Sequence, residues 1–469
     1  MDKNRRIARR KFIKYLSSLG LGISTSNALG GLHLLQHHGF YNNAVFYDGN
    51  YKALICIYLS GGNDSFNMLV PMEAKAYADY ASTRSELAIE RTRLLPIRPL
   101  NTNGVEYGLH PVMKNVQRLF ETEKLAFVVN IGTLIQPTAP EEVLKESVPL
   151  PLGLFSHSDQ THQWMTGWPH ERTLKGWGGK IADRMRSVNP SGEISMNISL
   201  SGTNVFQQGH HTIEFSVSVE DELLGIINYG MEDYSTYWSE YTRGIDSTLE
   251  RNYAHPFDRT YAEVLRKARD AYRDFNAAMQ QVGPLQTPFG DDELSKAMRR
   301  IVQIIKANQY LGFQRQIYFV EVPGWDNHDE LLNNHAELLE SLDTAVGSLW
   351  DGLVEIAAQD QVVVFVMTEF ARTLTSNGNG TDHAWGGNVF VFGGQVRGRR
   401  FYGEYPDLSL GAERMIYRQA LVPTLATDLY FAELAKWFGL HNSDILDIFP
   451  NLSNFHSMSQ GMPLGFLPG

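Results

Sequence analysis

The sequence predicts an α/β protein with a mostly parallel central sheet. Four apolar runs of strand length occur at residues 52–60, 125–132, 316–322 and 362–367. They are apolar almost throughout, as is typical of strands that are buried on both faces. Segments with helical periodicity separate several of them, and strands that alternate with helices predict βαβ units and parallel pairing.

The predicted helices cover residues 258–281, 292–311, 335–358 and 422–438, where apolar side chains recur at the spacing of one helix face. We interpret these apolar faces as core. Two short strands are expected at 194–200 and 212–219, whereas residues 220–251 have no clear period and predict an irregular segment. Residues 45–469 are therefore expected to form one domain with a cap-like excursion around residues 190–290.

The composition limits the possible classes of protein. The chain has 469 residues, of which 43% are hydrophobic and 20% are charged, as in ordinary globular proteins. Its formal net charge of −11 argues against nucleic-acid binding. Cys56 is the single cysteine, so no disulfide can form within the chain. No stretch reaches the roughly 20 apolar residues needed to cross a bilayer, so an integral membrane protein is not expected.

The N-terminal segment resembles a twin-arginine export signal. Arg9 and Arg10 are followed by Lys11-Phe12-Ile13-Lys14, then by a mildly apolar stretch and the small-x-small sequence Ser26-Asn27-Ala28. This pattern predicts a signal peptide at residues 1–28, the twin-arginine export machinery as a partner, and a periplasmic or extracellular location. The alternative is a basic amphipathic helix.

Acidic and histidine side chains follow the predicted strands directly. Carboxyl ends of parallel strands meet at one edge of a sheet, where ligands bind in α/β proteins, so we expect these side chains to gather there. Carboxylates and imidazoles are ligands for divalent metal ions such as zinc, manganese, magnesium or calcium. The candidate metal ligands are Asp64, Asp326, His328, Glu369, Asp382 and His383. The alternative is that Glu369 forms a surface ion pair with Arg372 and that His383 caps a turn.

Two metal ions about 4 Å apart would clamp both the entering and the leaving oxygen of an ester displacement. Ser158 is the best candidate for a hydroxyl nucleophile, with Thr133 and Ser65 as further candidates, and a nearby metal ion would have to lower the pKa of that hydroxyl. His157 precedes Ser158 and is a further candidate catalytic residue. Arg372 could bind an oxyanion through its planar fork, or it could orient Glu369.

A series of motifs is similar to the DUF1501 family, a group of exported bacterial proteins placed in the alkaline phosphatase and sulfatase superfamily. The matching segments, in chain order, are GGNDSFN at 61–67, HSDQTHQWMTG at 157–167, GWGGKIADR at 176–184, WDNHDE at 325–330, TEFART at 368–373, NGNGTDHAWGG at 377–387, VFGGQVRGRRFYG at 391–403 and VPTLATDLYFAELAKWFG at 422–439. The resemblance implies a three-layer α/β/α sandwich like that of alkaline phosphatase.

The resemblance also implies roles for single residues. Asp64 would match the metal aspartate after the first strand, Asp326 and His328 the first Asp/His metal pair, and His383 the late metal histidine. Glu369 stands where the superfamily has an Asp-His dyad, and Phe370 replaces the histidine of that dyad.

These observations favour an exported metal-dependent hydrolase of phosphate or sulfate esters, acting on a small-molecule or glycan ester. The alternative is a catalytically weak or inactive member of the superfamily that serves as a surface binding or assembly protein. Phe370 and the lack of an unmistakable nucleophile are the features that motivate this alternative.

Overall fold

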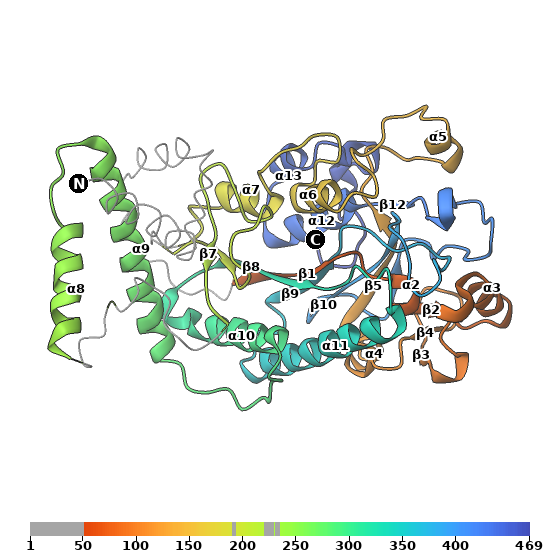
Figure 1. Ribbon diagram of the computed structural model, residues 1–469, viewed down its shortest axis with the longest axis horizontal. Helices are drawn as coiled ribbons and strands as arrows, with labels where there is room; N and C mark the ends of the chain where they lie inside the picture. Colours follow the sequence, from red (N-terminus) through yellow and green to blue (C-terminus); the bar gives the residue numbers. More distant parts are fainter. Residues whose placement is uncertain (1–50, 190–193, 220–228, 230–234) are drawn as a thin grey trace.

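The computed structural model describes residues 51–189, 194–219, 229 and 235–469. Within these ranges a nine-stranded sheet runs through the molecule in the order β11-β5-β10-β9-β1-β8-β6-β7, with β12 paired to β5 (Figure 1). Its strands are β1 (Lys52–Ser60), β5 (Leu125–Gly132), β6 (Asn197–Ser199), β7 (Phe215–Ser216), β8 (Arg315–Pro323), β9 (Val362–Met367), β10 (Gly387–Gly393), β11 (Phe401–Tyr402) and β12 (Leu425–Ala426).

The α/β prediction is confirmed, but the sheet is mixed rather than mostly parallel throughout. β1 pairs in parallel with both β8 and β9. β10 lies between β5 and β9 and is antiparallel to both. No helix separates β9 from β10. A parallel connection needs a crossover, usually a helix, so the chain returns in the opposite direction at this point.

Helices cover both faces of the sheet (Figure 1). One layer contains α4 (Lys114–Glu121), α10 (Glu293–Leu311) and α11 (Leu331–Glu355). The opposite layer contains α6 (His157–Thr166), α7 (Trp177–Arg184), α12 (Thr427–Phe438) and α13 (Asn442–Ile448). Residues Ala53 to Leu59 of β1 are at most 1% exposed, which explains why this run contains almost no polar residue.

Smaller elements complete the described chain. A second, three-stranded sheet has the order β2-β4-β3. The remaining strands and helices are α2 (Ser65–Met68), β2 (Leu69–Pro71), α3 (Ala74–Arg84), β3 (Leu95–Ile97), β4 (Tyr107–Leu109), α5 (Pro140–Leu144), α8 (Thr236–Leu249) and α9 (Pro256–Gln280). Short 3₁₀ helices occur at Ser85–Leu87, Arg91–Arg93, Tyr417–Gln419, Leu452–Asn454 and Met458–Gln460.

The segment expected to be irregular contains a regular helix. α8 occupies part of residues 220–251, its N-cap Ser235 accepts a hydrogen bond from the Trp238 backbone N–H, and it packs on α9. Its mixture of Tyr, Asp and Glu hid the period because little of α8 is buried. α8 lies at the opposite end of the molecule from α2, the helix that follows β1 (Figure 1).

Two sequence predictions concern the membrane and the N-terminus. No helix among the described residues is long and apolar enough to cross a membrane. The predicted signal peptide at residues 1–28 lies outside the described residues.

Candidate metal centre

The carboxyl ends of three neighbouring parallel strands form the floor of the site. β9, β1 and β8 are adjacent and end at Met367, Ser60 and Pro323. The Gly61 backbone N–H donates a hydrogen bond to Glu369 Oε1 at 2.8 Å, which ties the end of β1 to the segment after β9. Gly61 has φ +127°, and a Cβ there would lie 2.3 Å from the Asp326 backbone nitrogen. Only glycine allows this close approach between the two strand ends.

A folded-back loop brings His383 to the same edge. After β9, the Ala384 N–H donates to the Ala371 carbonyl at 2.9 Å, and the Thr373 N–H donates to the Asp382 carbonyl at 2.9 Å. These bonds place His383 opposite Arg372 in an isolated antiparallel bridge. Because β10 runs antiparallel to β9, the residues just before β10 lie at the edge where β9 ends.

Three imidazole rings and one carboxylate converge at this edge. His383 Nε2 lies 3.0 Å from His157 Nε2 and 3.0 Å from His328 Nε2. The Asp326 carboxylate lies 3.4 Å from His157 Nε2, 3.1 Å from His328 Nε2 and 3.3 Å from His383 Nε2. One ligand atom each from His157, Asp326 and His383 falls within 4.8 Å of the others. His157 arrives from the first turn of α6, far from the other ligands in sequence.

The second nitrogen of each ring faces an acceptor. His157 Nδ1 lies 2.8 Å from Glu369 Oε1, His383 Nδ1 lies 2.8 Å from the Phe155 carbonyl, and His328 Nδ1 lies 3.4 Å from Asp382 Oδ1. A carbonyl or carboxylate can only accept, so the proton of each neutral ring resides on Nδ1. The three Nε2 lone pairs then face one another and a carboxylate. Bare nitrogens this close repel one another unless a cation lies among them, so the residues present fit a divalent metal ion.

Neighbouring charges set the ionisation of the cluster. Burial alone would raise the pKa of Asp326, but the hydrogen bond and the charge of Arg372 hold that pKa below its usual value. The hydrogen bond that His157 donates to Glu369 raises the pKa of His157. Burial, together with the charges of Arg372 and His157, lowers the pKa of His383.

Glu369 and Asp382 contact the rings rather than the point where the rings converge. Glu369 is 1% exposed, and besides His157 it accepts hydrogen bonds from the Gly61 N–H and, at 3.1 Å, from the Tyr58 hydroxyl. Asp382 contacts His328 and the Asn377 amide at 3.3 Å. Carboxylates in these positions fix the tautomer and orientation of ligating histidines. Both residues therefore contact histidines of the cluster, whereas the sequence predicted them to be metal ligands themselves.

Asp64 lies outside the cluster. Its carboxylate forms a buried ion pair with the Arg84 guanidinium, and both side chains are 1% exposed. Burial raises the pKa of Asp64, and Arg84 offsets part of that shift. The sequence predicted Asp64 as one of six candidate ligands for two ions. Among the described residues only one His/Asp group of metal-binding geometry is found.

The three predicted catalytic residues have different environments. His157 is one of the converging imidazoles. Ser158 is exposed, and its Oγ lies 3.2 Å from Ser156 Oγ. The Arg372 side chain is 0% exposed and donates to Asp326 Oδ1 at 2.7 Å and to the Gly61 carbonyl at 3.2 Å. It therefore orients Asp326, whereas the sequence suggested an oxyanion or Glu369 as its partner.

Phe370 forms an apolar wall of the cluster. Its ring lies 4.7 Å from the His383 ring and 4.8 Å from the His157 ring. Gly62 has φ +86°, and a Cβ there would lie 2.4 Å from the Phe370 ring. Phe370 thus packs against two of the imidazoles and leaves no space for a side chain at position 62.

Sequence reasoning missed the residues that hold the cluster in place. They are Tyr58, whose hydroxyl reaches Glu369, and Phe155, whose backbone carbonyl accepts from His383. Sequence reasoning also missed Arg84, which pairs with Asp64 outside the cluster. Tyr58 lies in an apolar strand and Phe155 acts through its backbone, so neither carries a sequence signal. Arg84 is one of many arginines in the chain.

Fold and site together define an α/β protein with a candidate metal centre at the carboxyl edge of a mixed sheet. The chain belongs to the family described as "Protein of unknown function (DUF1501)", whose profile matches residues 51–449.

A search of curated proteins finds no match. Among solved structures, the chain is similar to i-CgsB bound to a neocarrahexaose, with 10% identity, 86% of this chain and 76% of that chain covered, and a TM-score of 0.32. It is also similar to the sulfatase PsFucS1 from Pseudoalteromonas sp., with 9% identity, 84% of this chain and 69% of that chain covered, and a TM-score of 0.35. A third similar structure is the lipoteichoic acid synthase LtaP from Listeria monocytogenes, with 10% identity, 84% of this chain and 80% of that chain covered, and a TM-score of 0.29.

Proposed function

We propose that the protein is an exported, metal-dependent hydrolase of phosphate or sulfate esters that acts on a small-molecule or glycan ester. The observation that carries the proposal is the convergence of the Nε2 atoms of His157, His328 and His383 on the Asp326 carboxylate. A divalent ion held by these four side chains would lower the pKa of a water molecule and polarise an ester oxygen.

The protein's own residues prepare this chemistry. Glu369 and the Phe155 carbonyl hold protons on Nδ1 of His157 and His383, which keeps the Nε2 lone pairs available. Arg372 keeps Asp326 ionised and fixes its orientation. Phe370 shields one side of the cluster from water. These contacts support a preformed, rigid ligand set.

Water is the proposed nucleophile rather than a protein hydroxyl. The Ser158 hydroxyl contacts Ser156, and no hydrogen bond joins it to the cluster among the described residues. Attack of water on the phosphorus or sulfur breaks the bond to the ester oxygen, which leaves as an alcohol after taking up a proton. The products are the alcohol and inorganic phosphate or sulfate.

The test uses two histidines of the same helix. The mature protein is purified, stripped with a chelator, reloaded with zinc, manganese, magnesium or calcium, and assayed for bound metal and for cleavage of an aryl phosphate and an aryl sulfate. His157→Ala is expected to lose both metal and turnover. His162→Ala is the control, because His162 also lies on α6 but its ring nitrogen contacts the Ser158 carbonyl, at 2.5 Å, rather than the cluster.

Each part of the proposal can fail separately. If no ion binds to the wild-type protein, the metal centre is wrong. If an ion binds but neither ester is cleaved with any metal, the hydrolase is wrong and the metal-dependent binding protein becomes the better description. Export is tested by locating the full-length protein in cell fractions, and an Arg9→Lys/Arg10→Lys variant is expected to remain in the cytoplasm.

A further inference from the structure

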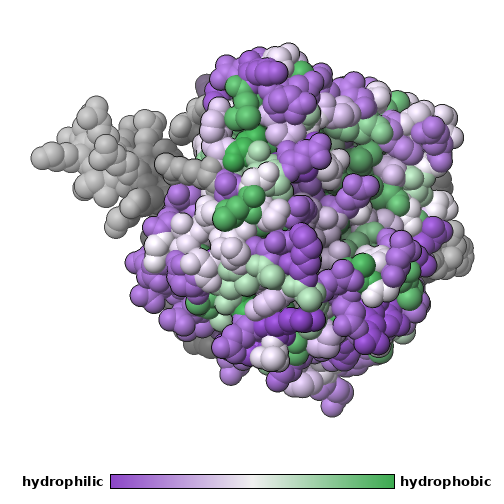
Figure 2. All heavy atoms as spheres, turned by 90° about the vertical axis from the view of Figure 1, so that its right-hand side faces the viewer, coloured by the Kyte–Doolittle hydropathy of each residue, from purple (hydrophilic) through white to green (hydrophobic). Residues whose placement is uncertain are grey.

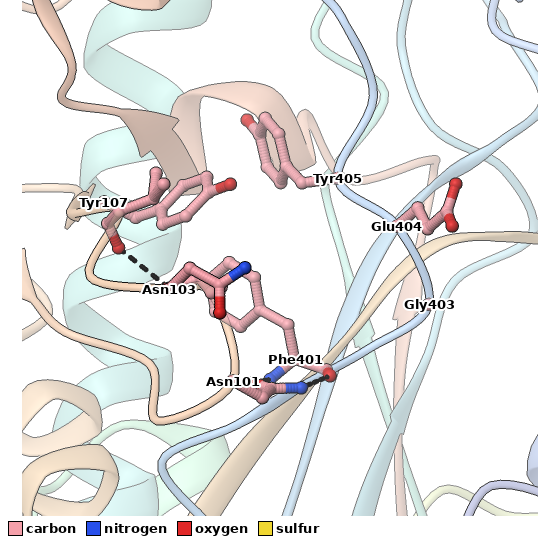
Figure 3. Close-up of a pocket in the computed structure, with 9 residues that line it drawn as sticks. Asn101, Asn103, Tyr107, Phe401, Gly403, Glu404 and Tyr405 are labelled. Atoms are coloured by element: carbon pink, nitrogen blue, oxygen red, sulfur yellow. Dashed lines mark hydrogen bonds between the residues drawn. The ribbon is translucent and has the colours of Figure 1, made fainter.

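A second site lies at the edge of the main sheet, in a cavity of about 280 Å³ next to β11 (Figure 3). Its lining comes from two chain segments that are far apart in sequence. These segments contribute Asn101, Thr102, Asn103, Val105 and Tyr107 on one side and Phe401, Gly403, Glu404 and Tyr405 on the other. The cavity shares no residue with the metal centre.

Three aromatic rings form a rigid wall of this cavity. The Tyr107 ring lies 4.7 Å from the Phe401 ring and 5.0 Å from the Tyr405 ring, with interplanar angles of 61° and 59°. The Tyr405 hydroxyl is fixed by donating to the Leu69 carbonyl at 2.6 Å. Tyr107 is only 9% exposed and Phe401 only 4%, so the rings are held by the core and can reorient little.

The two chain segments are locked together. The Asn101 amide donates to the Phe401 carbonyl at 2.7 Å, and its carbonyl accepts from the Phe401 N–H at 3.0 Å. The Thr102 hydroxyl contacts the Pro99 and Val105 carbonyls. The cavity is therefore built by specific bonds across the two segments and is not a gap between loose loops.

Three of the lining residues carry polar groups that remain free. The Asn103 amide, the Glu404 carboxylate and the Tyr107 hydroxyl have no hydrogen-bond or ion-pair partner in the part of the chain that the structure describes. Figure 3 shows the Asn103 and Glu404 side chains coming from the two opposite segments, with the Glu404 carboxylate directed away from the Tyr405 ring. Together they offer a donor-and-acceptor amide, an acceptor carboxylate and a hydroxyl that can do either.

This combination suits a neutral sugar ring. The apolar edges of these mostly buried rings can contact the C–H groups of a sugar, while amide and carboxylate groups bind its hydroxyls. A negative carboxylate without a counterion disfavours an anionic ligand. The surrounding face, which includes α3 and the small sheet, is mostly hydrophilic, and its apolar residues are scattered (Figure 2). A polar ligand therefore fits this surface better than an apolar segment of a partner.

The cavity also opens at the edge of the sheet that carries the metal centre. β11 is parallel to β5, and β5 and β9 are both antiparallel to β10. The carboxyl end of β11, where Gly403 follows, thus points the same way as the carboxyl end of β9. Three strand spacings separate β11 from β9, about 14 Å across the sheet. A chain of several sugar units could span that distance.

We propose that this cavity is a saccharide-binding site that takes one neutral sugar unit of a glycan. The proposal rests on the cavity alone and stands whether or not the metal centre hydrolyses esters. The binding experiment therefore uses chelator-treated mature protein.

The experiment measures binding of the methyl glycosides of glucose, galactose and N-acetylglucosamine by saturation-transfer NMR, with choline chloride as a cationic competitor. At least one glycoside is expected to bind. Asn103→Gly removes one hydrogen-bonding group, and Glu404→Gln replaces a charged acceptor by a neutral, weaker one. Each variant is expected to weaken that binding by about two- to tenfold. Asn103 has φ +52°, which glycine adopts without strain, so the first variant removes the amide and preserves the turn.

The matched control is Glu340→Gln, an exposed carboxylate on α11 remote from the cavity lining. Unchanged glycoside binding in this control and weakened binding in both cavity variants would support the proposal. Absence of binding by all three glycosides to the wild-type protein would overturn it. Binding of choline alone, lost in Glu404→Gln, would also overturn it in favour of a site for organic cations.

Discussion

The carboxylate of Glu369 offers a sharp test of the metal centre, because it can be neutralised without changing its shape. Its Oε1 accepts hydrogen bonds from the Gly61 N–H and from His157 Nδ1, both at 2.8 Å, and its Oε2 accepts from the Tyr58 hydroxyl at 3.1 Å. In Glu369→Gln the amide oxygen can keep the two bonds at Oε1. The amide nitrogen can donate to Tyr58, whose hydroxyl lies 2.6 Å from Thr161 Oγ1 and can donate there instead.

The substitution therefore removes a negative charge behind His157 and little else. Loss of such an outer contact typically weakens metal affinity about 10- to 100-fold, which corresponds to about 1.4–2.7 kcal/mol of binding free energy. Calorimetric titration of chelator-treated wild-type and variant protein with Zn²⁺ and Mn²⁺ measures this difference directly. Thermal unfolding of the metal-free proteins verifies that the variant is folded.

Glu340→Gln is the charge-matched control, since it also replaces one carboxylate by an amide but lies on the exposed side of α11. An affinity of Glu369→Gln within about twofold of the wild-type value would refute the idea that Glu369 tunes a ligating histidine. Equal weakening in both variants would show a general effect of net charge rather than a contact with His157.

Four further outcomes follow from the structure. Metal at 100 times its dissociation constant is expected to raise the free energy of unfolding by about 2.7 kcal/mol and Tm by about 3 °C for a chain of this length, and a chelator should reverse the shift in a thermal melt. Arg84→Met leaves Asp64 buried without its partner and is expected to cost about 3–5 kcal/mol in denaturant unfolding, part of which a second change, Asp64→Asn, should restore. Burial raises the pKa of Asp428 to about 8, whereas its pKa in the unfolded chain is about 3.9. Between these two pH values the folded state holds an extra proton, so the stability of the wild-type protein falls by up to about 1.4 kcal/mol per pH unit as pH rises. Asp428→Asn lacks this dependence, so its Tm relative to wild type should rise up to about pH 8 and then level off. Trp177→Ala empties a fully buried position that contacts Phe206, Phe365, Phe431 and Phe449, and a loss of less than about 3 kcal/mol in chemical unfolding would contradict its place in the core.

The strands of the central sheet could be predicted because their burial leaves a direct trace in the sequence. β1, β5 and β9 have the bounds that the apolar runs predict, since each is buried along nearly its whole length. The direction of β10 left no such trace. Its apolar run looks the same in either orientation, and only the absence of a helix between β9 and β10 determines that it runs back.

The site could be predicted in its position but not in its inner arrangement. The rule that ligands gather at the carboxyl ends of parallel strands requires only the order of the elements, and Asp326 and His383 do lie together at that edge. Which side chain touches which depends on distances of a few tenths of a nanometre that no sequence spacing encodes. Glu369 and Asp382 are of a residue type that can ligate a metal, yet each contacts the far nitrogen of a histidine.

Asp64 illustrates why residue type alone is an insufficient guide to metal ligation. It follows β1 as a ligand would, but α3 ends with Arg84, whose guanidinium reaches the same buried point. A buried carboxylate needs compensation for its lost hydration, and either a cation from solvent or a fixed arginine can provide it.

The number of metal ions that this edge of the sheet can hold therefore depends on which carboxylates already have an arginine as their cationic partner. Asp64 is already neutralised by Arg84. Arg372 neutralises part of the charge of Asp326, whose side chain stays 43% exposed to solvent and contacts the imidazoles. Three neutral histidines supply lone pairs but no charge. The described residues thus offer one strong position for a divalent cation, at the point where His157, His328 and His383 meet Asp326. An ion bound by Asp64 would have to displace Arg84, which would leave the buried guanidinium without its partner.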